Sequence, residues 1–151
     1  MAKKKPQQKR VITNRRARFD YAIEDSLVVG ISLSGAETKS LRRGHGQLQG
    51  AYVTVKGGEL WLINATITGD KSIQIPESEQ TRARKLLARR REIDRFIAAK
   101  QQGRTIVPLE ILPTGRFIKV RIAIGKGKKK YDKRETIKRR TQDREARRMM
   151  R

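Results

Sequence analysis

The sequence predicts a mainly β fold: a small barrel of short antiparallel strands, with packed helices and a basic C-terminal tail. Two observations predict the barrel, namely segments in which apolar and polar residues alternate and turn residues that join such segments. Alternation with a period of two is typical of strands, because successive side chains point to opposite faces. A third observation, a segment of helical periodicity between two candidate hairpins, predicts that a helix interrupts the strands.

The clearest hairpin joins two strands through adjacent glycines. Ala51–Lys56 and Glu59–Ile67 flank Gly57 and Gly58, and glycine supplies the positive φ that a tight turn between strands requires. A second strand pair is predicted within residues 104–125, around a turn at 113–115. One face of its second strand carries the apolar side chains of Ile118, Val120, Ile122 and Ile124.

Three further details of the strands follow from residue type. Lys119 and Arg121 alternate with the apolar face and are expected to point outward. Pro108 has no amide hydrogen to donate, so its strand is expected to lie at an edge or to be bulged there. Another strand is predicted at Phe19–Glu24, because apolar and polar residues alternate there and Tyr21 falls on the apolar face.

The segment that follows, residues 25–41, allows two interpretations. Ser26 could cap a short helix through Gly35, followed by a strand at residues 37–41. Propensity alone equally allows a strand at Leu27–Leu33.

The interrupting helix is predicted at Thr81–Lys100, with Gly103 just past its end. Its apolar stripe consists of Leu86, Leu87, Ile93, Phe96 and Ile97. Short strands interrupted by such a helix favour a partly open barrel of five or six strands, of the oligonucleotide-binding type.

The charge of the chain indicates a polyanionic partner. The 151 residues carry a formal net charge of +23. Residues 1–19 hold eight basic residues and no acidic one, and residues 126–151 hold thirteen basic and four acidic residues. These ends are expected to be an arm at residues 1–18 and a tail at residues 126–151, on either side of a more ordinary core at residues 19–125. Nucleic acid is the favoured partner, because no segment has the broad apolar face that binding to an anionic membrane needs.

Several classes of protein are disfavoured. The chain has no cysteine, which excludes disulfides and thiolate zinc sites and suits a reducing cytoplasm. No apolar run approaches the length of a membrane span, and the basic N-terminus lacks the apolar segment of a secretory signal. The single histidine, His45 between two glycines, has no catalytic partner marked by a motif. We therefore expect no enzyme, no metal and no cofactor.

The tail has the charge spacing of a helix but lacks an apolar face with which to pack against the core. Its acids Glu135 and Asp143 precede arginines by four positions, which supports a helix. Apolar residues are too few to form a stripe. We expect residues 126–151 to be disordered alone and to fold when phosphates supply the counter-charge.

Four ordered blocks carry a resemblance to a known family. They are "NRRARFDYAIED", "G-x-E-x-KSLR-x-G" from Gly35 to Gly44, "TRARKLLARRREI" and "AIGKGKKKYDKRETIKRR". The chain resembles the SmpB family over nearly its whole length. These are the bacterial SsrA-binding proteins that partner transfer-messenger RNA. The resemblance implies an oligonucleotide-binding-type barrel with three helices and a C-terminal tail, and it favours a short helix near Leu27–Ser34 over the strand.

The resemblance also implies two sets of site residues. The first contacts the elbow of the tRNA-like domain of transfer-messenger RNA, or supports that site: Asn14, Arg15, Arg16, Lys39, Ser40, Arg42, Arg82, Arg84 and Lys85. The second would enter the decoding centre and the empty messenger channel of the ribosome: Gly127, Lys128, Tyr131, Asp132, Lys133, Arg134, Arg139, Arg140, Arg144, Arg147 and Arg148. Tyr131 would stack on a ribosomal base.

The resemblance predicts an adaptor of trans-translation that works in the cytoplasm as a monomer, with no membrane partner. Its partners would be transfer-messenger RNA and the small-subunit RNA of the ribosome, with alanyl-tRNA synthetase and elongation factor Tu reached through the RNA complex. Two alternatives use the same basic arms: a ribosomal or ribosome-assembly protein, and a histone-like DNA binder.

Overall fold

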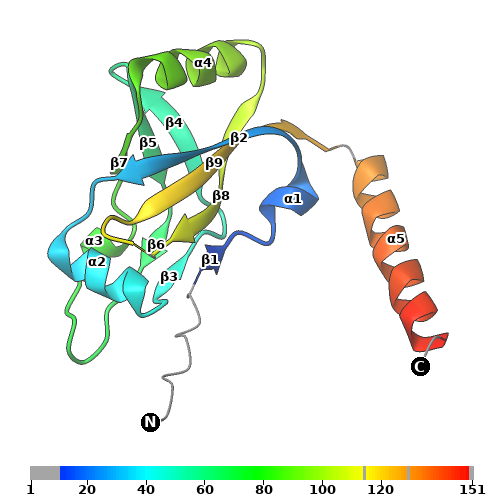
Figure 1. The fold of residues 1–151 in the computed structure, drawn as a ribbon, viewed down its shortest axis with the longest axis horizontal. Coiled ribbons are helices and arrows are strands. Elements are labelled where there is room, and N and C mark those ends of the chain that lie inside the picture. The colour runs from blue at the N-terminus through cyan, green and yellow to red at the C-terminus, as the bar shows by residue number, and fades with distance from the viewer. Residues whose placement is uncertain (1–10, 114, 129, 150–151) are drawn as a thin grey trace, which may run out of the picture.

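A closed ring of strands forms the body of the protein. The structure, a computed structural model, describes residues 11–113, 115–128 and 130–149. One sheet follows the order β1, β8, β4, β5, β7, β2, β9, and a further pairing of β8 with β9 closes the ring (Figure 1). The strands are β1 Ile12–Thr13, β2 Tyr21–Ile31, β4 Tyr52–Lys56, β5 Glu59–Ile63, β7 Arg84–Leu87, β8 Thr105–Leu112 and β9 Lys119–Gly127.

The mainly β, barrel-like prediction is therefore confirmed, and the ring encloses the core. Fully buried side chains include Leu60, Leu62, Leu86 and Ile122, which come from β5, β7 and β9. Strand β1 pairs with β8, so the folded body reaches back into the segment 1–18 that was assigned to an arm.

Both predicted hairpins form, with one strand shorter than expected. β4 pairs with β5 across Gly57 and Gly58, both with positive φ. β5 ends at Ile63, because Asn64 takes a left-handed φ of 61° that a continuing strand does not allow. The following β6, Thr66–Ile67, pairs instead with β3, Gly46–Gln47.

The second pair, β8 with β9, confirms the predicted faces. Ile118, Val120, Ile122 and Ile124 are all buried, whereas Lys119 is exposed and Arg121 half-buried. The register of the pair shifts between Pro108 and Glu110. This is the bulge that the missing amide hydrogen of Pro108 predicts.

The short helix expected near Leu27–Ser34 is wrong. Strand β2 runs without interruption to Ile31 and pairs with β9 on one side and β7 on the other. The strand that the residues alone allowed at Leu27–Leu33 was the better interpretation. The helix follows it instead: α2, Gly35–Arg42, replaces the strand expected at residues 37–41.

A capping box explains where α2 begins. The Ser34 hydroxyl accepts a hydrogen bond from the Glu37 amide at 3.2 Å, and the Ser34 amide donates to the Glu37 carboxylate at 2.9 Å. This Ser-x-x-Glu spacing is a local signal for a helix start. Phe19 also lies in a helix, α1 Ala17–Asp20, so the strand predicted from Phe19 begins only at Tyr21.

The helix predicted at Thr81–Lys100 is correct only in its second half. Residues 84–87 form strand β7, and helix α4 spans Arg90–Gln101. Arg84 and Leu86 are buried while Leu87 is exposed, which is the period of a strand rather than a helix. A single turn, α3 at Glu77–Gln80, precedes them. Gly103 ends α4 with a φ of 84°, as predicted.

The tail forms one long helix beside the barrel. α5 spans Lys130–Met149 and leaves the body at the end of β9, with α1 between it and the barrel (Figure 1). Ile137 and Met149 on this helix are exposed. No helix in the described ranges has both the length and the apolar character of a membrane span.

Candidate nucleic-acid interface

The first set of predicted site residues falls on two parts of the body. One part is the segment after β1, which carries Asn14, Arg15 and Arg16. The other is formed by α2 and the segment that leads into β7. In each part the structure separates buried residues, which position neighbouring elements, from exposed cations.

In the first part, Asn14 is a positioning residue. Its side chain is 8% exposed, and its Nδ2 donates to the Pro108 carbonyl at 2.9 Å while its amide donates to Leu109 at 2.8 Å. The bulge of β8 thereby holds the segment in place. Arg15 and Arg16 are exposed and remain able to reach a phosphate.

In the second part, one carboxylate ties α2 to β7. Glu37 is 2% exposed, and its two oxygens accept hydrogen bonds from Arg82 and from the Nε of Arg84, the latter at 2.5 Å. Arg84 is fully buried and also donates to the carbonyls of Ala65 at 2.7 Å and Gln80 at 2.9 Å. The guanidinium therefore links β7 to the loop after β5 and to the end of helix α3.

The environment keeps this pair ionised. Burial on its own would raise the pKa of Glu37, but hydrogen bonds from Arg82, the Ser34 amide and Arg84 together hold that pKa below the ordinary 4.5. Burial lowers the pKa of Arg84, and the Glu37 carboxylate opposes that effect. Removing either partner of a buried ion pair destabilises the fold, because the other partner is left as a buried charge without a counter-charge.

The remaining residues of the second part differ in exposure. Lys39 and Arg42 are exposed on α2, and Lys85 is half-buried on β7. Arg42 donates to the Arg116 carbonyl at 3.1 Å. Ser40 is fully buried, and its hydroxyl has no hydrogen-bond partner among the described residues. Lys39 and Ser40 lie on helix α2 rather than on the strand expected at residues 37–41, and Lys85 lies on a strand rather than on the expected helix.

His45 lies beside an acid rather than in open solvent. Its Nε2 is 3.6 Å from the Asp70 carboxylate, to which Arg43 also donates at 2.8 Å. Hydrogen bonds from the Ser72 hydroxyl and amide, and then from Arg43, hold the pKa of Asp70 well below its usual range. Asp70 organises this loop and offsets the local positive charge.

The sequence interpretation missed an exposed apolar hollow next to this second part. A cavity of about 410 Å³ is lined by Leu87, Phe117 and Lys119, among others. Phe117 is 67% exposed, and the Arg116 guanidinium lies 5.6 Å from its ring. Exposed aromatic and cationic side chains together suit stacking on RNA bases. A strand interpretation of "TRARKLL" would have placed Leu87 on this outer face.

The base of the tail is fastened to α1. The Lys128 amide donates to the Asp20 carbonyl at 2.9 Å, and its Nζ donates to the Arg18 carbonyl at 3.1 Å. Lys133 forms an ion pair with the Asp20 carboxylate at 3.2 Å. Gly127 is still part of the barrel, opposite Tyr21.

The other predicted tail residues extend along α5. The side chains of Tyr131 and Asp132 lie outside the part that the structure describes, and with them the predicted stacking role. The exposed cations on this helix include Arg134, Arg139, Arg140, Arg144, Arg147 and Arg148.

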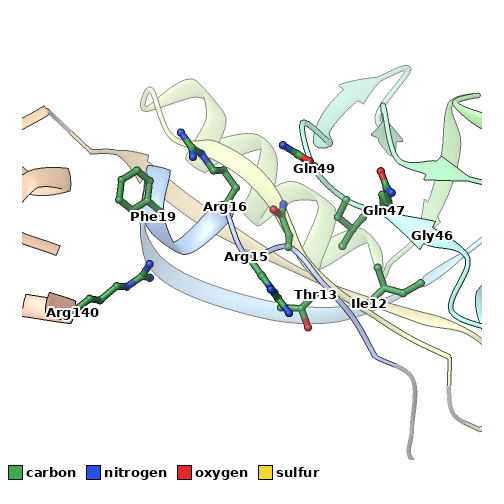
Figure 2. Close-up of a pocket in the computed structure, with 11 residues that line it drawn as sticks. Ile12, Thr13, Arg15, Arg16, Phe19, Gly46, Gln47, Gln49 and Arg140 are labelled. Atoms are coloured by element: carbon green, nitrogen blue, oxygen red, sulfur yellow. The ribbon is translucent and has the colours of Figure 1, made fainter. Parts of the chain in front are cut away.

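Arg140 is a further tail residue that faces the body. Figure 2 shows it reaching from α5 toward the segment that carries Arg15 and Phe19. With Arg15, Arg16 and Gln49 it lines a cavity of about 710 Å³. The structure thus brings together residues that the sequence interpretation had assigned to two different RNAs.

Comparison with known proteins identifies the family. The family model described as SmpB protein matches residues 11–151. The chain belongs to the SmpB family. Relatives named SsrA-binding protein include that of Paracoccus denitrificans, 45% identical over 150 residues, which cover 98% of this chain and 96% of the relative. Another, from Coxiella burnetii strain Dugway 5J108-111, is 44% identical over 149 residues, 97% of this chain and 94% of the relative.

A solved structure shares the SmpB fold of this chain. It is called "tmRNA-SmpB: a journey to the center of the bacterial ribosome", and the matching chain is 36% identical with a TM-score of 0.66. The match covers 84% of this chain and 94% of the other. The family resemblance predicted from four sequence blocks is confirmed.

Proposed function

We propose that this protein is a non-enzymatic RNA-binding adaptor of trans-translation. It binds the tRNA-like domain of transfer-messenger RNA and delivers that RNA to stalled ribosomes. The observation that carries the proposal is SmpB family membership over residues 11–151, joined to a barrel whose exposed cations lie around buried positioning residues. The matched solved structure, which by its name concerns tmRNA-SmpB and the bacterial ribosome, supports both RNA partners.

The body, residues 19–125 with the arm 1–18, is the part that holds transfer-messenger RNA. The exposed cations Arg15, Arg16, Lys39 and Arg42, with half-buried Arg82 and Lys85, contact phosphates near the RNA elbow. The buried Asn14, Ser40 and Arg84 support the site without touching RNA. Phosphate contacts of this kind give affinity and register rather than sequence readout.

The tail, residues 126–151, detects whether the messenger channel of the ribosome is empty. Its high cation density and small apolar surface make α5 marginal in the free protein, and phosphates of the decoding centre and the empty messenger channel stabilise it. The adaptor works as a cytoplasmic monomer. Alanyl-tRNA synthetase and elongation factor Tu join it through the RNA.

The first test is the RNA that the protein retains in cells. The expected result is that tagged full-length protein, purified and analysed by RNA sequencing, enriches one transfer-messenger RNA above ribosomal RNA. Bulk ribosomal RNA alone would favour a structural ribosomal or assembly role, and DNA retained as tightly as RNA at equal salt would favour a histone-like role. Either of these results would contradict the proposal.

A second prediction concerns the start of the tail. Tyr131→Ala should impair tagging of stalled chains more than Lys129→Ala, because one stacked ring is not replaceable whereas one of many cations is. Loss of a stacked base contact costs about 1–3 kcal/mol, which corresponds to an effect of roughly fivefold to 150-fold. The measurement is the tagging rate in a reconstituted translation system. Equal rates for the two variants would count against a stacking role.

A further inference from the structure

The cavity between the body and the tail is a basic site built from both ends of the chain. Its walls are the segment after β1, the loop after β3 and helix α5, and its volume is about 710 Å³ (Figure 2). Among the described residues, three arginines line it, Arg15, Arg16 and Arg140, and no acidic residue does. Cations gathered in this way repel one another unless an anion lies between them.

Two of the three guanidinium groups are available to a ligand. Among the described residues, no ion pair involves Arg15 or Arg140. Arg16 meets Asp20 at 3.4 Å and lies 5.1 Å from the Phe19 ring. Guanidinium groups bind phosphate oxygens in a planar, two-point geometry.

The remaining lining favours a nucleotide chain over a simple anion. Thr13, Gln47 and Gln49 place a hydroxyl and two amides at the same cavity, and Phe19 adds an aromatic ring. Amides and hydroxyls donate to and accept from base edges and 2′-hydroxyls, which single-stranded RNA exposes. Phosphate, base and sugar thus each have a suitable partner here.

The position of Arg140 depends on how the tail is fastened. Lys133 is paired with Asp20 at 3.2 Å and lies 5.8 Å from the Phe19 ring. Arg140 follows Lys133 by seven residues, or about two helical turns, so the two side chains lie on the same face of α5. The Asp20 ion pair therefore turns the face that carries Arg140 toward the body.

We propose that this cavity binds a short single-stranded stretch of RNA, clamped between Arg15 and Arg16 of the body and Arg140 of the tail. The ion pair of Asp20 with Lys133 holds the tail where it completes the site. The inference rests on the proposed function for the class of ligand. It adds a site that requires the tail to be docked, and this site shares Arg15 and Arg16 with the elbow-binding set. RNA in this site also supplies counter-charge that stabilises α5.

The test uses the full-length protein and a fluorescent single-stranded RNA decamer, with binding followed by anisotropy at fixed low salt. Arg140→Ala should weaken decamer binding about tenfold, because it removes a charge-assisted hydrogen bond to a phosphate. Lys138→Ala removes the same charge from an exposed position that does not line the cavity, and should weaken binding less than about twofold. Equal losses in the two variants, or no loss in either, would overturn the proposal.

A double-mutant cycle tests the fastening. In an Asp20→Asn background, the effect of Arg140→Ala should shrink to that of Lys138→Ala, because the tail is no longer held over the cavity. An undiminished Arg140 effect would show that Asp20 does not position the tail. Binding of the isolated tRNA-like domain is measured in parallel and should not respond to Arg140→Ala. If the cavity site fails, this second readout stays intact, whereas failure of the adaptor function abolishes selective binding of the tRNA-like domain.

Discussion

Deletion of residues 131–151 is expected to leave binding of the tRNA-like domain nearly unchanged and to abolish tagging of stalled chains. The exposed cations of the body stand on a barrel that is closed by β8 and β9 without any contribution from α5. The ring and its buried positioning residues therefore remain when the tail is removed. In the proposed function the tail makes the contacts with the ribosome, so its loss should remove the second activity alone.

The measurement pairs a gel-shift titration with a tagging assay on the same protein preparation. A control chain carries the tail residues in scrambled order, which keeps the composition and charge of the tail. It should bind the tRNA-like domain normally and fail in tagging. If truncation weakens RNA binding and tagging to the same extent, the proposed division between body and tail is wrong. If the scrambled tail supports tagging, charge alone is sufficient.

The second large effect concerns Glu37, the carboxylate that neutralises buried Arg84. Glu37→Gln keeps the shape of the side chain but leaves the guanidinium without a counter-charge. Breaking a buried ion pair in this way lowers the free energy of unfolding by about 3–5 kcal/mol, a large part of the roughly 5–15 kcal/mol that a domain has. Urea denaturation at neutral pH measures the loss. Glu77→Gln, at an exposed position on α3, is the matched control and should change stability little.

The same carboxylate makes stability depend on pH. Because the pKa of Glu37 is lower in the folded state than its ordinary 4.5, the unfolded chain takes up the proton first. The contribution of Glu37 to the stability of the fold is therefore complete above pH 4.5, the ordinary pKa. It is lost as the pH falls through the lower pKa of the folded state. The difference in stability between wild type and Glu37→Gln should narrow on acidification over this range. A difference that stays constant, or a loss below about 1 kcal/mol at neutral pH, would contradict an ionised, structural Glu37.

Local patterns were enough to predict the hairpins, the bulge at Pro108 and the mainly β barrel. The capping-box spacing of Ser34 and Glu37, which marks the start of α2, was not used, and a strand was expected at residues 37–41. The family resemblance favoured a helix near Leu27–Ser34. The residues themselves had left the correct strand open.

The other errors have a tertiary cause. "TRARKLL" has good helix formers, yet residues 84–87 form a strand that pairs with β5 and β2 and whose Arg84 donates to Glu37 and the Ala65 carbonyl. No local pattern contains these partners. The cavity lined by Arg15, Arg16 and Arg140 could not be predicted from local patterns either, because it is formed by segments from opposite ends of the chain. The sequence shows which residues are cationic, but the fold decides which of these residues lie close together in space.

We propose that the tail detects a vacant messenger channel while the body carries transfer-messenger RNA. The most direct test of this claim compares ribosomes stalled on a message that ends in the decoding centre with ribosomes whose message fills the channel. Tagging by the full-length protein should be fast on the first and strongly reduced on the second, while binding of transfer-messenger RNA to the protein is the same in both reactions. Equal tagging of the two kinds of ribosome would contradict the claim.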